Sequence, residues 1–316
     1  MIEIFYKKDG QIMVSQSETD LVSIAYNDVV WIDLFVPSGE EKRAVEHYLG
    51  TTIQNRAQAE EIEISSRFYE TEKAIFANTS FLIPGPDEYN EETVSFILTG
   101  DILTTLRECP LKSFTDLQRR ILAFPKMYDS GHVAFLSILE QRIDLDADMV
   151  ELVSKEITQY NKKVSLGEDI SEEFLVDLNQ LQDNTMLIRE NIVDKQRVIS
   201  SIIKSKKYPV EYHSKLNVLL KDISSLINHT NFSFERLEYL QNTVLGIISL
   251  DQNKIMKVFT LVPLMLMPPT LIASFFGMNV KFGWFGDAGW SWVIALVLMT
   301  ISTIVIFWIF KRRNMF

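Results

Sequence analysis

Two long runs without a charged residue lie near the C-terminus, and they constrain the fold more than any other feature. The first spans 258–280, which is 23 residues, and the second spans 290–310, which is 21 residues; neither contains Asp, Glu, Lys or Arg. Each is long enough to cross a hydrocarbon layer about 30 Å thick. Tryptophans, which are common at membrane–water interfaces, lie near their ends: Trp284, Trp290, Trp292 and Trp308. These features predict two membrane-spanning helices rather than two buried helices of a soluble domain.

The basic residues beside these runs predict the orientation of the helices. Lys254 and Lys257 precede the first run and the basic tail 311–313 follows the second, whereas the connecting segment holds only Lys281 and Asp287. Because Lys and Arg are enriched on the cytoplasmic side, we expect both chain ends in the cytoplasm and the short loop outside. The first residues have the pattern of neither a signal peptide nor a transit peptide. We therefore expect a multi-pass protein of the plasma (inner) membrane.

The charge is unevenly distributed along the chain. The whole chain has a net charge of -11, but the first 256 residues hold 26 basic and 41 acidic residues, a net charge of -15. Such an acidic body argues against a nucleic-acid-binding protein. The excess of acidic residues has two explanations: it keeps the domain soluble, or it attracts cations toward the mouth of a pore. The single cysteine, Cys109, excludes an internal disulfide framework and a cysteine-rich zinc site.

The first 130 residues have the pattern of an α+β domain, a mixed sheet with helices. Ser38 is a plausible N-cap for a helix that follows it, and Gly100-Asp101 has the pattern of a turn between strands. The predicted strands are 2–6, 12–15, 29–35, 67–70, 74–82, 94–98 and 102–107.

A helical pattern begins near His132 and continues into the membrane. It breaks at Gly167 and at 206–209, and the last helix is predicted to run over 210–276, or about 100 Å. Apolar residues at steps of three and four along it predict packing against other helices. We divide the chain into an α+β domain (1–130), cytoplasmic helices with a stalk (131–256), a first span (257–279), an outer loop (280–289), a second span (290–310) and a basic tail (311–316).

The first span carries a polar stripe. Eight residues follow one another at steps of three and four, so they share one face of a helix: Asn253, Met256, Thr260, Pro263, Met267, Thr270, Ser274 and Gly277. Small and polar residues of this kind mediate tight packing of membrane helices, or they line a pore with apolar constrictions. Two spans cannot enclose an ion path, so a pore requires a ring of subunits.

The end of this span resembles a known family. Gly277-Met278-Asn279, placed between two C-terminal spans, resembles the signature of the CorA family of divalent-cation channels. The segments 251–257 and 267–272 are similar to the family before this motif, and 30–34 and 66–70 are similar to its N-terminal domain. The resemblance covers essentially the whole chain.

The resemblance implies a fold and a function. It implies a funnel-shaped homopentamer with an αβα cytoplasmic domain, a long stalk helix and two spans. It implies uptake of Mg²⁺, with Co²⁺ or Ni²⁺ also accepted, by a channel and not by an enzyme. Gly277, Met278 and Asn279 would form the selectivity filter. The pore lining and gate would comprise Asn253, Met256, Met267 and Thr270. Family members close when cytoplasmic Mg²⁺ binds acidic residues, for which Asp222 is the candidate.

The chemistry of an asparagine ring suits a hydrated ion. Mg²⁺ loses its bound waters reluctantly, and neutral amide oxygens can accept hydrogen bonds from those waters without removing them. The sequence has no phosphate-binding loop of the type that ATPases use. The membrane potential is therefore the expected driving force, at about 4.6 kcal/mol per divalent ion and 100 mV.

One departure from the family keeps alternatives open. Many relatives have Met-Pro-Glu-Leu after the motif, whereas the loop here, 280–287, has no glutamate. A Zn²⁺ transporter of the same superfamily (the ZntB type) is therefore one alternative. A membrane-anchored coiled-coil scaffold is the alternative from another class.

Other titratable residues do not form a recognisable site. The four histidines, at positions 47, 132, 213 and 229, lack metal-ligand spacing and are expected to be structural. A solvated face is the favoured interpretation for two sets of acidic residues: Asp33, Glu60, Glu61 and Glu63, and Asp144, Asp146 and Asp148.

Overall fold

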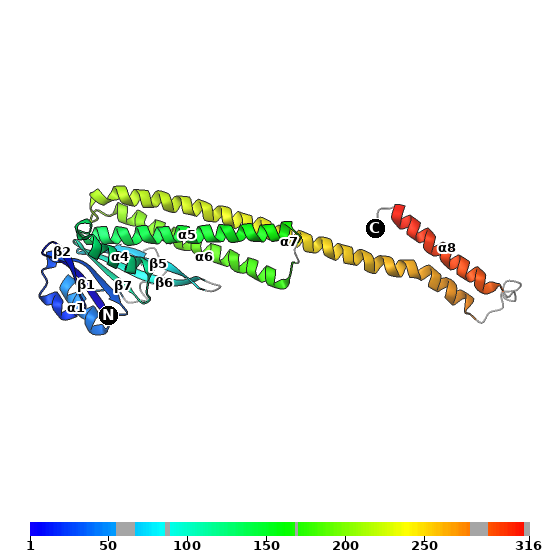
Figure 1. Ribbon diagram of the computed structural model, residues 1–316, viewed down its shortest axis with the longest axis horizontal. Coiled ribbons are helices and arrows are strands. Elements are labelled where there is room, and N and C mark those ends of the chain that lie inside the picture. The colour runs from blue at the N-terminus through cyan, green and yellow to red at the C-terminus, as the bar shows by residue number, and fades with distance from the viewer. Residues whose placement is uncertain (55–66, 86–88, 168–169, 279–289, 313–316) are drawn as a thin grey trace. The chain divides into compact units, whose positions relative to one another are not determined.

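The structure consists of two compact units. It is a computed structural model that describes residues 1–54, 67–85, 89–167, 170–278 and 290–312 (Figure 1). The first unit is Met1–Leu240 and the second is Gln241–Phe316. The predicted class, a mixed-sheet α+β domain with a long helix and two C-terminal apolar helices, is confirmed. The finer division at residues 130 and 256 stays a prediction.

A seven-stranded mixed sheet forms the centre of the first unit. Its strand order is β2-β1-β3-β7-β6-β5-β4. Strands β3 and β7 are parallel, and their other neighbours pair in antiparallel fashion. Each predicted strand is present: β1 (Ile2–Lys8), β2 (Gln11–Ser15), β3 (Val29–Phe35), β4 (Phe68–Glu70), β5 (Ala74–Pro84), β6 (Tyr89–Thr99) and β7 (Ile102–Arg107).

Helix α1 (Gly39–Leu49) begins and ends at residues suited to those positions. The Ser38 Oγ accepts from the Glu41 backbone N–H at 3.1 Å, and the Glu41 carboxylate accepts from the Ser38 N–H at 2.7 Å. This reciprocal capping box satisfies two N–H groups that a helix start leaves unpaired. Gly50 follows the last turn with φ of 64°, a conformation that glycine adopts without strain. The predicted N-cap is confirmed.

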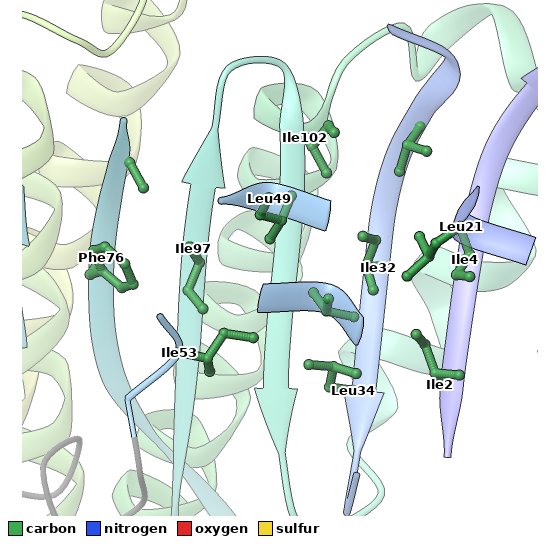
Figure 2. Close-up of a cluster of buried hydrophobic side chains, with 13 residues drawn as sticks. Ile2, Ile4, Leu21, Ile32, Leu34, Leu49, Ile53, Phe76, Ile97 and Ile102 are labelled. Carbon is green, nitrogen blue, oxygen red and sulfur yellow. The ribbon is translucent and has the colours of Figure 1, made fainter. Parts of the chain in front are cut away.

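Helices cover both faces of the sheet. On one face, Ile2, Ile32, Leu34 and their neighbours form an apolar cluster with Leu49 of α1 (Figure 2). On the other face, Trp31 packs against Phe114 of α4 (Lys112–Ala123). The long helices α5 (Gly131–Ser165) and α6 (Glu172–Lys204) contact this face too, as Figure 1 shows. Because side chains alternate between the two faces of a strand, both faces of the sheet are buried. The layers are therefore αβα.

Helix α7 (His213–Phe276) is a single 64-residue helix. In the first unit it packs on α5 and α6, where Arg236 Nη2 donates to Thr158 Oγ1 at 3.0 Å and Arg189 Nε donates to Asn231 Oδ1 at 2.7 Å. Helix α8 (Ser291–Arg312) follows α7 in the chain. Short 3₁₀ turns complete the described elements: η1 (Glu18–Val22), η2 (Tyr26–Asp28), η3 (Pro125–Met127) and η4 (Val210–Tyr212).

The solvated-face interpretation was wrong for Asp33 and Asp146. Asp33 is 1% exposed because it shares the covered face of β3 with Trp31, and Arg107 Nη2 pairs with it at 2.8 Å. Asp146 is equally buried because it follows Ile143 by three residues on the inner face of α5. The interpretation is confirmed for Asp144 and Asp148, which are exposed. Glu60, Glu61 and Glu63 lie outside the described residues.

Candidate ion pathway

Two helices of the second unit are long and apolar enough to cross a membrane. They are the C-terminal part of α7 and the whole of α8. Their apolar side chains are largely exposed, including Val262 and Leu271 on α7 and Ile304 on α8. A helix of a soluble core would bury such side chains, whereas a bilayer solvates them. The predicted spans are therefore confirmed as apolar helices of the required length.

The predicted stripe lies on an uncovered face of α7. Met256 is 62% exposed and Met267 is 63% exposed. The other members are exposed too: Asn253, Thr260, Pro263, Thr270, Ser274 and Gly277. No contact within the described part of the chain covers this face, so it is available to water or to other subunits.

The opposite face of the same helix is the covered one. Leu261 is 7% exposed, and Met265, Pro268, Ile272 and Phe276 are partly buried. At 100° per residue this second set lies about half a turn away from the stripe. The stripe therefore does not mediate helix packing within this chain. Of the two interpretations of the stripe, packing between subunits and a pore lining are left.

The threonines of the stripe are oriented by the helix itself. Thr260 Oγ1 donates to the Met256 carbonyl at 2.8 Å, and Thr270 Oγ1 donates to the Leu266 carbonyl at 2.7 Å. Each hydroxyl hydrogen is thus used within the helix, and the oxygen lone pairs are left to accept. Such acceptors suit the waters around a cation, which present their hydrogens outward. Thr260 and Ser274 belong to this face but were not predicted as site residues; the spacing of three and four is the signal that includes them.

Three prolines lie inside this part of α7, yet the helix continues through them. A proline has no N–H, so the carbonyl four residues earlier loses its helical partner. The carbonyls affected belong to Phe259, Leu264 and Met265. In a membrane such groups need water or protein partners, so these positions favour a hydrated surface or a contact between subunits over lipid.

Helix α7 ends at the signature motif. Gly277 N–H donates to the Ala273 carbonyl at 2.9 Å and Met278 N–H donates to the Phe275 carbonyl at 3.3 Å. A Cβ added at Gly277 would lie 3.2 Å from the Ala273 oxygen, which is a tight contact. A glycine thus lets the backbone pass close to the last turn. Asn279 lies outside the described residues, so its role stays a prediction.

Charged residues mark the cytoplasmic ends of both spans. Lys254 Nζ and Asp251 Oδ1 form an exposed ion pair at 2.7 Å before the first span. At the end of α8 the Arg312 guanidinium lies 5.3 Å from the centre of the Trp308 ring. A tryptophan and an arginine together are typical of the interface between lipid and water.

Asp222, the predicted regulatory residue, belongs to no candidate metal site in the described part of the chain. This residue is exposed on α7. Within the residues that the structure describes, no group of three or more His, Cys, Asp or Glu side chains is placed to hold a metal ion. The regulatory role of Asp222 therefore stays a prediction.

Comparison with known proteins agrees with this architecture. The profile of the family described as "CorA-like Mg2+ transporter protein" matches residues 26–312. A protein of Wolinella succinogenes named "Magnesium transport protein CorA" is 33% identical over 99% of both chains.

Solved structures show the same fold. The complete CorA magnesium transporter from Methanocaldococcus jannaschii superimposes with a TM-score of 0.84 at 16% identity, covering 99% of this chain and 98% of the other. The ZntB cytoplasmic domain from Vibrio parahaemolyticus is less similar, with a TM-score of 0.57 at 16% identity over 78% of this chain and 97% of the other. Since the family profile spans most of the sequence, this chain, an inner-membrane protein with a cytoplasmic N-terminal domain, belongs to the CorA-like Mg²⁺ transporter family.

Proposed function

We propose that this chain forms a homopentameric channel through which Mg²⁺ enters the cell, driven by the membrane potential. The observation that carries the proposal is the uncovered stripe on α7 that leads to Gly277-Met278-Asn279 in a member of this family. The stripe provides hydroxyl and amide oxygens together with flexible methionines. It has no carboxylate that would hold a divalent ion tightly.

A ring of subunits explains why the stripe is uncovered in one chain. A chain with two spans cannot surround an ion path. Five α7 helices around an axis would turn the stripe inward and leave the opposite face, with Leu261 and Ile272, for protein contacts. Met256 and Met267 would then form apolar rings that exclude water when the pore is narrow.

The filter would select a hydrated ion. Mg²⁺ keeps its first-shell waters because removing them is costly. The amide oxygens of Asn279, which follows α7 in the sequence, would accept hydrogen bonds from those waters. Thr270, nine residues earlier in the sequence, would continue this series with the lone pairs of its hydroxyl oxygen.

Mg²⁺ is favoured over Zn²⁺ as the transported ion. The relative from Wolinella, which is named for magnesium transport, shares 33% of its residues with this chain over nearly the full length. The likeness to a ZntB protein covers the cytoplasmic domain at 16% identity. Co²⁺ and Ni²⁺ are proposed as further substrates, and cytoplasmic Mg²⁺ bound near Asp222 is proposed to close the channel.

Flux into liposomes tests the proposal. Purified full-length protein is reconstituted with an inside-negative potential, and Mg²⁺ and Zn²⁺ entry are measured separately. Asn279→Ala is compared with Thr300→Ala, which removes an exposed hydroxyl from α8 outside the stripe. We expect Mg²⁺ entry that Asn279→Ala abolishes and Thr300→Ala preserves.

Two other outcomes would contradict the proposal. Zinc entry without magnesium entry would assign the chain to the zinc branch. Absence of flux of both ions, from protein shown to be folded and inserted, would favour the scaffold.

A further inference from the structure

An apolar cavity of about 420 Å³ lies in the first unit. The end of β5, the start of α4 and the middle of α5 line it. Most of its lining is apolar and includes Leu111 next to the start of α4 and Leu145, Met149 and Leu152 from α5. Cavities of this volume with apolar walls and a few polar groups are typical of small-ligand sites.

A buried arginine lines this cavity. The Arg142 side chain is 5% exposed. Its Nη1 donates to the Leu82 carbonyl at 2.8 Å, and its Nη2 lies 2.5 Å from Asp146 Oδ1. Its Nε has no hydrogen-bond partner among the residues that the structure describes. A buried guanidinium donor without a partner is costly, and an acceptor in the cavity would remove that cost.

The charges around Arg142 are not balanced. Asp146 Oδ2 also pairs with the fully buried Lys195 Nζ at 3.0 Å, so one carboxylate serves two buried cations. The neighbouring carboxylate, Asp194, pairs with a third cation, Arg67, at 3.5 Å. Burial lowers the pKa of Lys195 to about 8, against the opposing attraction of Asp146. Counted over the described residues, the cluster therefore holds three cations and two carboxylates beside an apolar space.

The start of α4 adds further positive potential. Lys112 is the first residue of α4 and lines the cavity. Leu111, at the N-cap, offers no side-chain cap, and the first turn contains no acidic residue. The partial positive charge of a helix start is therefore not neutralised by the helix's own side chains. Among the lining residues that the structure describes, Asp148 is the single carboxylate, and it is exposed.

We propose that this cavity binds a small organic carboxylate with an apolar body. Arg142 and Lys112 would hold the carboxylate, and the side chains of Leu145 and Met149 would contact the apolar part. Asp146 stays engaged with Arg142 and Lys195, so the ligand would supply the missing negative charge. This inference does not depend on the proposed ion flux.

Calorimetry on the full-length protein in detergent tests the inference, with 4-phenylbutyrate as the probe. The neutral alcohol 4-phenylbutan-1-ol is the control, because it has the same apolar body without the carboxylate and shows how much of the heat comes from partition into detergent. Lys112→Gln removes one cation, and Arg119→Gln is the matched control because Arg119 is 79% exposed on the same helix and does not line the cavity. We expect saturable binding of the acid, weakened about tenfold by Lys112→Gln and unchanged by Arg119→Gln.

A second variant tests the cavity itself. Leu145→Trp fills the space and is expected to abolish binding of the acid. Lys112→Gln still decides the matter if that variant does not fold. The inference is overturned if the acid shows no saturable binding, if the alcohol binds equally well, or if Lys112→Gln binds as the native protein does.

Discussion

Thr270 and Ile272 are two residues apart on α7, yet they lie on opposite faces of the helix: Thr270 is exposed and Ile272 is partly buried. The same division holds along the membrane part of α7. The stripe on the open face includes polar side chains, whereas the side chains on the covered face are all apolar: Leu261, Met265, Pro268, Ile272 and Phe276. A helix that only anchors a protein needs no such division, whereas a helix that lines a water-filled path does.

The methionines on the open face predict a gate. Replacing Met256 with serine should admit water into the constriction and raise Mg²⁺ flux several-fold at high internal Mg²⁺, because a polar ring resists dewetting. Met265→Ser, on the covered face, makes the same chemical change and should leave the flux at high internal Mg²⁺ near the native value. Flux into liposomes loaded with Mg²⁺ measures the difference. Equal flux through the two variants would place the gate elsewhere.

The buried ion pair of the sheet predicts a large loss of stability. Asp33 accepts from Arg107 Nη2 at 2.8 Å and from Thr105 Oγ1 at 2.7 Å. Asp33→Ala leaves the buried Arg107 guanidinium without its carboxylate, so we expect a loss of about 3–5 kcal/mol in the free energy of unfolding. Asp144→Ala, on an exposed position of α5, should change it by less than about 0.5 kcal/mol. Thermal unfolding in detergent measures both, and a similar small change for both would contradict the account.

Burial of His132 predicts a dependence of stability on pH. Its ring is stacked on Tyr212 and meets the Tyr208 ring edge-on, with centroids 5.6 and 5.1 Å apart. Burial lowers its pKa below the ordinary 6.5, against the opposing influence of Asp101 and Glu211. The unfolded chain therefore takes up the proton first, so this contribution is complete above pH 6.5 and is lost as the pH falls below it.

The difference between variants isolates this effect from the titration of carboxylates. The Tm of the native protein should fall more steeply between pH 7 and pH 5.5 than the Tm of His132→Phe. His229→Phe is the control because His229 is exposed on α7, and it should follow the native protein. Parallel curves for all three proteins would show that His132 does not titrate as we infer.

The contact at Gly131 predicts a strict requirement for glycine. A Cβ at this position would lie 2.1 Å from the Leu103 backbone nitrogen. Gly131→Ala must therefore move β7 or α5, at a cost of about 3 kcal/mol or more. Gly246→Ala, on an open face of α7, should instead stabilise the helix by about 0.5–1 kcal/mol. Thermal unfolding of the two variants measures whether the changes in the free energy of unfolding have opposite signs.

Most of the fold follows from patterns that repeat along the chain. Alternation and turn residues predicted the strands, and Gly167 and 206–209 predicted where the long helices break. The polar stripe followed from its spacing of three and four residues.

The burial of Asp33 and Asp146 was missed because a carboxylate predicts an exposed position unless its partner is known. Arg107 lies 74 residues from Asp33, and Lys195 comes from another helix. For Asp146, the sequence did contain a nearby indication of a partner: Arg142 lies four residues earlier, which is the spacing of an ion pair on one helix face.

Cysteine accessibility along α7 tests the central claim most directly. In a Cys109→Ser background, single cysteines replace Thr270 on the open face and Ile272 on the covered face. A membrane-impermeant, positively charged thiol reagent is then applied while Mg²⁺ flux into liposomes is followed. We expect the reagent to block flux through Thr270→Cys and to leave flux through Ile272→Cys unchanged. Block at Ile272→Cys without block at Thr270→Cys would contradict the assignment of the stripe to the pore.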